Sequence, residues 1–186
     1  MSITIARRAV LAIAATSGIL AGTAGLADAH TVNPNGYVIV QSCTSLSGTV
    51  TLSPGLRAKA HTETAVVSGT LDGCSSYGSG QPGQGSFTAV VSGMASTTAG
   101  TLTGSFTANW PASSGLNPSN GTVTITTVAK GQYTVGGSVT SGAWTGTNLS
   151  TGYVVTGTTG TGTKNNPITA QTFVNTSALQ LGRNGG

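Results

Sequence analysis

The chain has 186 residues, a formal net charge of +4 and only 5% charged residues. Nucleic-acid binding depends on clustered Lys and Arg that neutralise phosphates, and the few cations here are scattered along the sequence, so we expect no nucleic-acid partner. Carboxylates are scarcer still: after residue 30 only Glu63 and Asp72 remain. A glycosidase needs two acids that face one bond, and the nucleophile elbow of an α/β-hydrolase needs a GxSxG motif, which this sequence lacks. The composition therefore predicts a non-enzymatic protein without a cofactor.

The N-terminus has the layout of a secretory signal peptide. Arg7 and Arg8 precede an apolar stretch, and Ala27-Asp28-Ala29 is an A-x-A cleavage site. Polar and small residues dilute the apolar stretch, which argues against a membrane anchor, and no later segment is apolar enough to span a bilayer as a helix. We therefore expect a signal peptide over residues 1–29 and one secreted or cell-surface domain over residues 30–186.

Downstream of the signal, apolar residues recur at every second position, which is typical of strands with one buried and one solvated face. The alternate positions hold Thr and Ser, which suit a pleated surface and keep it solvated. In chain order the apolar positions are Tyr37–Gln41; Val50 and Leu52; Val67 and Leu71; Phe87, Ala89 and Val91; Leu102, Phe106, Ala108 and Trp110; Val123 and Ile125; Tyr133, Val135 and Val139; and Phe173, Leu179 and Leu181.

Turn signals separate these runs about every 8–14 residues, and no amphipathic helix interrupts them. They include Ser53-Pro54-Gly55, Asp72-Gly73 and the hairpin dipeptide Asn120-Gly121. The pattern predicts about nine to ten short antiparallel strands, arranged as an immunoglobulin-like sandwich or a small barrel.

Cys43 and Cys74 are the only cysteines. In an exported protein such a pair is expected to form a disulfide bond. The bond closes a loop of about 32 residues and contributes roughly 3–4 kcal/mol in the chain-entropy model. A reactive thiol and a metal site are less favoured, and no CxxC spacing supports the metal site.

Three segments with this chemistry resemble a known group of proteins. Cys43–Leu56, Val67–Cys74 and Gly104–Trp110 are similar to segments of small, uncharacterised, exported actinobacterial proteins that are rich in Thr and Gly and carry one Cys pair. The resemblance covers roughly residues 42–182. It implies an all-β exported domain and supplies no catalytic residues.

His30 is the candidate metal ligand, because cleavage after Ala29 makes it the mature N-terminus. Its α-amine and imidazole, with His61 as a third ligand, would form a T-shaped nitrogen site suited to Cu(II). This histidine brace is similar to that of copper-dependent polysaccharide monooxygenases. The chain lacks that family's aromatic-rich flat face and acidic second shell, so a copper-binding protein or monooxygenase is the alternative function.

Arg57, Lys59, His61 and Glu63 alternate, so on a strand they would point to one face. As a functional cluster they would grip an anionic ligand such as a wall phosphate or a uronate. The favoured interpretation is structural, a charged edge that prevents strand-to-strand aggregation.

Aromatic side chains are the remaining candidates for ligand contact. Trp144, Tyr77 and Tyr153 are flanked by small and polar residues, so we expect them to be exposed and able to stack on sugar rings. Trp110 and Tyr133 lie on apolar faces and are expected to anchor the core.

The sequence thus favours an exported binding or structural module of the cell envelope or extracellular space, with cell-wall or extracellular polysaccharide as its candidate partner. An exported envelope pore is disfavoured, because the chain shows no paired aromatic girdles and no consistently apolar outward band.

Overall fold

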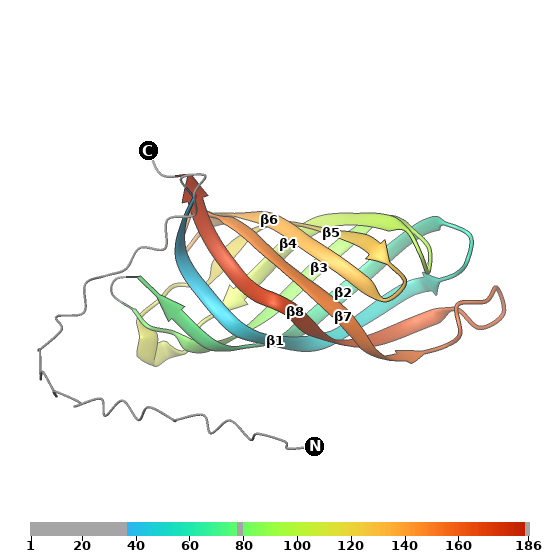
Figure 1. Ribbon diagram of the computed structural model, residues 1–186, viewed down its shortest axis with the longest axis horizontal. Coiled ribbons are helices and arrows are strands. Elements are labelled where there is room, and N and C mark those ends of the chain that lie inside the picture. The colour runs from blue at the N-terminus through green and yellow to red at the C-terminus, as the bar shows by residue number, and fades with distance from the viewer. Residues whose placement is uncertain (1–36, 78–79, 185–186) are drawn as a thin grey trace, which may run out of the picture.

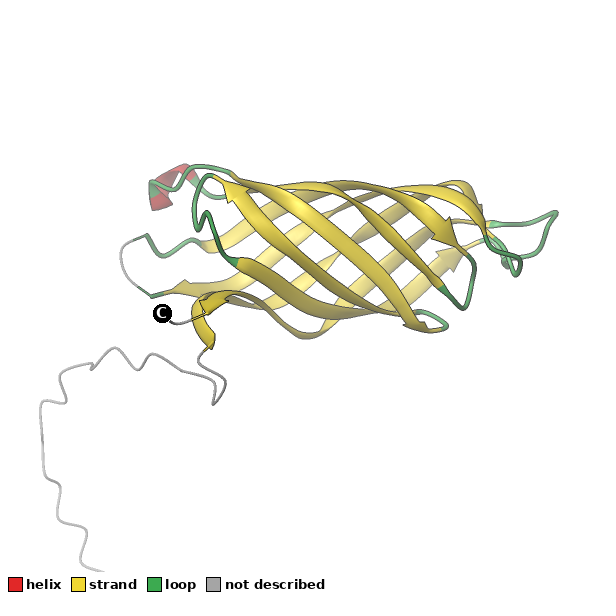
Figure 2. Cartoon of the chain, turned by 90° about the horizontal axis from the view of Figure 1, so that it is seen from above, coloured by secondary structure: helices red, strands yellow, loops and turns green. Residues whose placement is uncertain are grey.

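The computed structural model describes residues 37–77 and 80–184, which form one closed antiparallel barrel of eight strands (Figure 1). Each strand pairs with its neighbours in the chain, and β1 pairs with β8 to close the sheet. The strands are β1 (Tyr37–Leu56), β2 (His61–Ser76), β3 (Gly83–Ala95), β4 (Gly100–Asn109), β5 (Ser119–Ala129), β6 (Gln132–Ser141), β7 (Asn148–Thr159) and β8 (Ile168–Asn184). One short 3₁₀ turn, η1 (Ala112–Ser114), lies between β4 and β5 (Figure 2).

The all-β expectation and its barrel form are confirmed, whereas the sandwich and the count of nine to ten short strands are wrong. Three of the expected turns lie inside strands. The expected hairpin at Asn120-Gly121 is wrong, because both residues belong to β5 and pair with β4, and the register with β6 shifts between them. Ser53-Pro54-Gly55 belongs to the 20-residue β1, near a shift in its register with β8 between Thr51 and Leu56. Asp72-Gly73 belongs to β2, where the register with β3 shifts between Asp72 and Cys74. Such irregularities bend a strand without ending it, so turn-type residues here mark bulges. The expected signal peptide, residues 1–29, lies outside the described residues.

The two faces of the sheet differ sharply in chemistry. Apolar side chains point inward and fill the barrel, as the alternation predicts. Hydroxyl side chains point outward, and many pair across strands: Thr49 with Ser68 at 3.3 Å and Thr122 with Ser138 at 3.0 Å between hydroxyl oxygens. The outer wall is therefore nearly uncharged and rich in Thr and Ser, and it also exposes a few apolar side chains, among them Val66, Val90 and Met94.

Gly48 and Gly69, directly paired on β1 and β2, let two aromatic rings lie against the backbone inside the barrel. A Cβ added to Gly48 would lie 2.9 Å from Cζ of Phe173, and one added to Gly69 would lie 2.8 Å from Cε1 of Phe87. The missing side chains at these strand positions thus make room for core aromatics.

Connections alternate between the two ends of the barrel. We call the end with Tyr37, Asn184 and the β2–β3, β4–β5 and β6–β7 connections the terminal end, and the opposite end the distal end (Figure 1). Near the terminal end Cys43 and Cys74 face each other across β1 and β2, and they form the expected disulfide, with an S–S distance of 2.12 Å.

Candidate ligand-binding groove and the ends of the barrel

The barrel interior is a packed core with small voids. Its two cavities measure about 70 Å³ and 20 Å³, both far below the roughly 300–1,000 Å³ typical of small-molecule sites. Tyr153 lines both cavities and stacks on Tyr133, with ring centroids 4.7 Å apart, and it also contacts Phe173 at 4.8 Å. Because the larger cavity is lined almost wholly by apolar side chains, it is expected to stay dry.

Burial raises the pKa of the phenols of Tyr153 and Tyr133 above their usual 10.0. For Tyr153 the nearby Tyr133 adds to the rise, and for Tyr133 a hydrogen bond donated by Gln171 partly offsets it. Burying either phenolate without compensation is costly, so the folded barrel keeps both phenols protonated at neutral pH.

Alkaline pH is therefore expected to destabilise the barrel. Above pH 10.0 the unfolded chain loses phenolic protons that folded Tyr153 retains, so the unfolded state binds fewer protons and stability falls as pH rises. Each such tyrosine contributes about 1.4 kcal/mol per pH unit. Urea unfolding measured between about pH 9 and pH 11 should show that the free energy of unfolding falls less steeply with pH for Tyr153→Phe than for the wild type. Equal slopes of this free energy against pH would contradict the prediction.

A groove of about 370 Å³ lies on the outer wall over β2, β3 and β4 near the terminal end. Its size falls within the range of ligand sites, unlike the interior cavities. The sheet register assembles it: Asp72 pairs with Gln84, Thr70 with Ser86, and Ser86 with Asn109. The lining residues are Thr70, Asp72, Gln84, Gly85, Ser86, Asn109, Trp110 and Pro111.

Trp110 directly follows β4 and is held rigidly where it lines this groove. Its ring lies over Gly85, where an added Cβ would come within 2.8 Å of Cζ3. The indole N–H donates to Oγ of Ser119 at 3.1 Å, and the Ser119 hydroxyl donates to the carbonyl of Ala143 at 2.8 Å. Trp144 packs edge-on against the ring at 4.8 Å between centroids. Because Gly85 pairs with the buried Leu71 and so faces the barrel interior, the ring of Trp110 lies toward the inner side of the sheet, and its N–H is already bonded.

The polar side chains of the groove are free to bind a ligand. Asp72, Gln84, Ser86 and Asn109 are exposed, and within residues 37–77 and 80–184 none of their side chains makes a hydrogen bond or ion pair. A carboxylate accepts hydrogen bonds, whereas amides and a hydroxyl both donate and accept. The groove is thus lined by the half-buried Trp110 and by four polar residues whose side chains are unengaged.

A second groove, of about 480 Å³, lies over β1, β7 and β8. It is lined mainly by threonines, including Thr49, Thr158 and Thr172, and has neither an aromatic ring nor a charged side chain. It is larger but offers nothing on which an apolar ligand face would stack.

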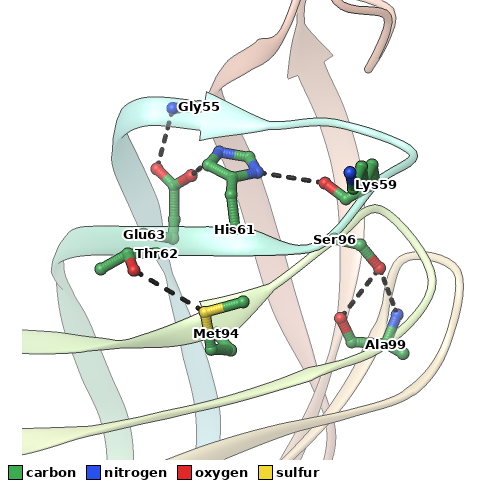
Figure 3. Close-up of polar contacts among 8 residues, drawn as sticks. All are labelled: Gly55, Lys59, His61, Thr62, Glu63, Met94, Ser96 and Ala99. Carbon is green, nitrogen blue, oxygen red and sulfur yellow. Dashed lines mark hydrogen bonds and ion pairs between the residues drawn. The ribbon is translucent and has the colours of Figure 1, made fainter.

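At the distal end Glu63 points into the barrel and is fully buried (Figure 3). Its Oε1 accepts a hydrogen bond from the backbone N–H of Gly55 at 2.9 Å, and its Oε2 lies 3.1 Å from Nε2 of His61. The other ring nitrogen of His61, Nδ1, lies 3.1 Å from the carbonyl of Lys59.

The contact with Lys59 determines which ring nitrogen of His61 carries a proton. A carbonyl can only accept, so Nδ1 of His61 must carry a proton and donate it to Lys59. If the ring of His61 is neutral, Nε2 presents a lone pair to Glu63, and this lone pair attracts only a protonated carboxyl group. If the ring is charged, it attracts a carboxylate. The 3.1 Å contact between Nε2 and Oε2 therefore joins two side chains that are both anchored to backbone groups of the distal end.

The expected Arg57–Glu63 strand is only partly observed. His61 and Glu63 lie together on β2, but Arg57 and Lys59 belong to the β1–β2 connection. The interpretation of the cluster as a protective sheet edge does not fit, because the sheet closes on itself and β2 is paired on both sides.

The aromatic candidates lie in different places. The expectation that Tyr153 is exposed is wrong: it is 4% exposed, in the interior, because its strand position faces inward. Tyr77 is exposed at 40%, and Trp144 is half-buried against the core and Trp110. Trp110 and Tyr133 do pack into the core as expected, and Trp110 also lines the groove.

His30 lies outside the described residues. His61 has both ring nitrogens engaged, by Glu63 and Lys59, so copper would have to displace one of these contacts. Among residues 37–77 and 80–184 no three His, Cys, Asp or Glu side chains are grouped as a metal site.

Comparison with known proteins found no match among family models, curated proteins or solved structures. None of the helices in the described ranges is long and apolar enough to cross a membrane.

Proposed function

We propose that this protein is an exported, non-enzymatic binding module whose groove over β2–β4 holds a neutral polysaccharide chain at the cell envelope or in the extracellular space. The observation that carries this proposal is the groove itself, which is lined by Trp110 and by the exposed polar residues Asp72, Gln84, Ser86 and Asn109.

The chemistry of sugars matches this combination. A pyranose ring has apolar C–H faces that pack on an aromatic surface, and hydroxyls that both donate and accept hydrogen bonds. Asp72 accepts hydrogen bonds from sugar hydroxyls, whereas the amides of Gln84 and Asn109 both donate and accept them. The groove lining contains one carboxylate and no cation, so it favours neutral sugars or amino sugars over uronates.

The outer wall also suits a chain rather than a single sugar. Ser47, Thr70, Ser86 and Asn109 form one cross-strand row from β1 to β4, passing through the groove. Along this row hydroxyl and amide groups follow one another at the spacing of neighbouring strands, about 4.8 Å. A polysaccharide lying in the groove therefore meets further hydrogen-bonding groups on β1.

Retention on insoluble polymers tests the proposal. We expect the wild type to bind at least one of chitin, cellulose and purified cell wall, and the Ser86→Ala/Asn109→Ala variant to bind about tenfold or more weakly, since two hydrogen bonds are lost. The matched control is Ser92→Ala/Thr103→Ala, another cross-strand pair on β3 and β4 that lies outside the groove. Equal retention of the two variants, or no retention of the wild type on any polymer, would contradict the proposal.

A further inference from the structure

The charges that look scattered in the sequence gather at one end of the fold. Arg57 and Lys59 lie in the β1–β2 connection, Lys130 in the β5–β6 turn and Lys164 in the β7–β8 connection, all at the distal end (Figure 1). The other charged residues in the described ranges are the buried Glu63 at this end, and Asp72 and Arg183 nearer the terminal end. Between Asp72 and the distal connections the outer wall carries no charge.

The four cations, which we call the basic rim, are uncompensated. Lys59, Lys130 and Lys164 are exposed and Arg57 is half-buried. Within the described part of the chain none of them pairs with a carboxylate, because Glu63 contacts His61 and Asp72 lies toward the opposite end. The Nε–H of Arg57 is buried and has no acceptor there. The rim thus concentrates positive potential and leaves a hydrogen-bond donor unsatisfied.

Backbone hydrogen bonds hold three of the distal connections together. The N–H of Ala58 donates to the carbonyl of Gly162 at 3.0 Å, and the N–H of Thr97 donates to the carbonyl of Arg57 at 2.9 Å. Within the β7–β8 connection three successive N–H groups, from Thr161 to Thr163, converge on the carbonyl of Asn166. Arg57, Lys59 and Lys164 therefore project from a fixed frame, which lowers the entropy cost of binding.

We propose that the basic rim is a binding site for a phosphate-bearing anionic polymer. Arg binds phosphate oxygens in a bidentate manner and Lys binds them as a point charge. A polymer with repeated phosphates matches several cations spread around one barrel end, whereas a single small anion would meet only one or two.

The composition of the rim disfavours a lipid membrane as the occupant. The connections at residues 57–60, 96–99, 130–131 and 160–167 contain no large aliphatic or aromatic side chain that would insert beyond the cations. Interfacial binding normally combines cations with such apolar residues. The exposed Met94 and Val128 lie near the distal ends of β3 and β5, on the wall rather than in the connections. The connections themselves offer electrostatic and hydrogen-bonding contacts alone, which suit a soluble or wall-attached polymer.

This site is independent of the polysaccharide groove, which lies toward the terminal end and contains a carboxylate. Binding of long-chain inorganic polyphosphate, measured by fluorescence anisotropy over a series of salt concentrations, tests it. We expect affinity to fall steeply with salt, because each phosphate contact releases counterions. The Lys59→Gln/Lys130→Gln/Lys164→Gln variant should bind at least about 30-fold more weakly, since three of the four cations are removed.

The matched control is Arg183→Gln, which removes one cation at the terminal end and should bind polyphosphate like the wild type. Thermal unfolding establishes that both variants are folded, and retention of the triple variant on the polysaccharide that binds the wild type separates this site from the groove. No binding of polyphosphate by the wild type, equal binding by the triple variant, or binding only to phosphatidylglycerol vesicles would overturn the proposal.

Discussion

Replacing Glu63 by alanine is expected to lower the free energy of unfolding by about 3–5 kcal/mol, as for other broken buried ion pairs. The change leaves the N–H of Gly55 without its acceptor, removes the partner of Nε2 of His61, and opens a void in a position that is 0% exposed. These effects act on the folded state and not on the unfolded chain, since an unpaired buried polar group and a cavity both raise the free energy of the folded protein.

Denaturant unfolding with two control variants separates the network from mere loss of volume. Glu63→Gln keeps the shape: its carbonyl oxygen accepts from Gly55 and its amide donates to neutral His61, so we expect a loss of no more than about 1.5 kcal/mol. Thr64→Ala, the outward neighbour on the same strand, should stay within about 0.5 kcal/mol of the wild type. A Glu63→Ala protein as stable as Thr64→Ala would show that the network contributes nothing.

Removing the disulfide with Cys43→Ala/Cys74→Ala is expected to lower the free energy of unfolding by roughly 3–4 kcal/mol. The bond restricts the unfolded chain more than it shapes the folded one, because β1 and β2 are already paired along most of their length. The variant should therefore keep its β-sheet circular dichroism spectrum and unfold at a lower urea concentration.

The burial of this bond gives the same prediction a second readout. Cys43 is 0% and Cys74 is 5% exposed, so a reductant should reach the sulfur atoms only after the barrel opens. We expect the folded wild type to resist dithiothreitol, and to be reduced and alkylated once urea is added. Rapid reduction in native buffer, or a double variant as stable as the wild type, would contradict this account.

Local sequence patterns predicted the chemistry of the fold well. The alternation of apolar and polar residues identified the inward residues, among them Phe106, Val123 and Phe173. The presence of two cysteines in the sequence predicted the observed disulfide bond. The strand count failed because Ser53-Pro54-Gly55, Asp72-Gly73 and Asn120-Gly121 have turn composition but lie within paired strands. In β1 and β2, pairing with two neighbouring strands outweighed local turn preference.

The two proposed sites depend on information that local patterns do not contain. The groove joins Asp72, Gln84 and Asn109 from three strands, and only the register places them side by side. The basic rim depends on the number of strands: connections in an up-and-down barrel alternate between ends, so those that follow β1, β5 and β7 share an end. If the number of strands predicted between Lys59 and Lys130 were wrong by one, the two residues would be assigned to opposite ends of the barrel.

Tyr153 shows a further limit of composition. Its flanking Gly and Thr residues resemble those of an exposed loop, yet its place on β7 turns the ring into the core beside Tyr133 and Phe173. In a chain whose surface is built from Thr and Gly, small neighbours do not distinguish exposed aromatic residues from buried ones.

The most direct test of the polysaccharide proposal is an NMR titration of the ¹⁵N-labelled protein with soluble oligosaccharides of chitin and cellulose. The proposal predicts that amide shifts cluster on β2, β3 and β4 around Thr70, Gln84 and Asn109, together with the indole resonance of Trp110. The Ser86→Ala/Asn109→Ala variant should lose these shifts. Shifts centred on another face, or unchanged spectra with every oligosaccharide, would contradict the groove as the binding site.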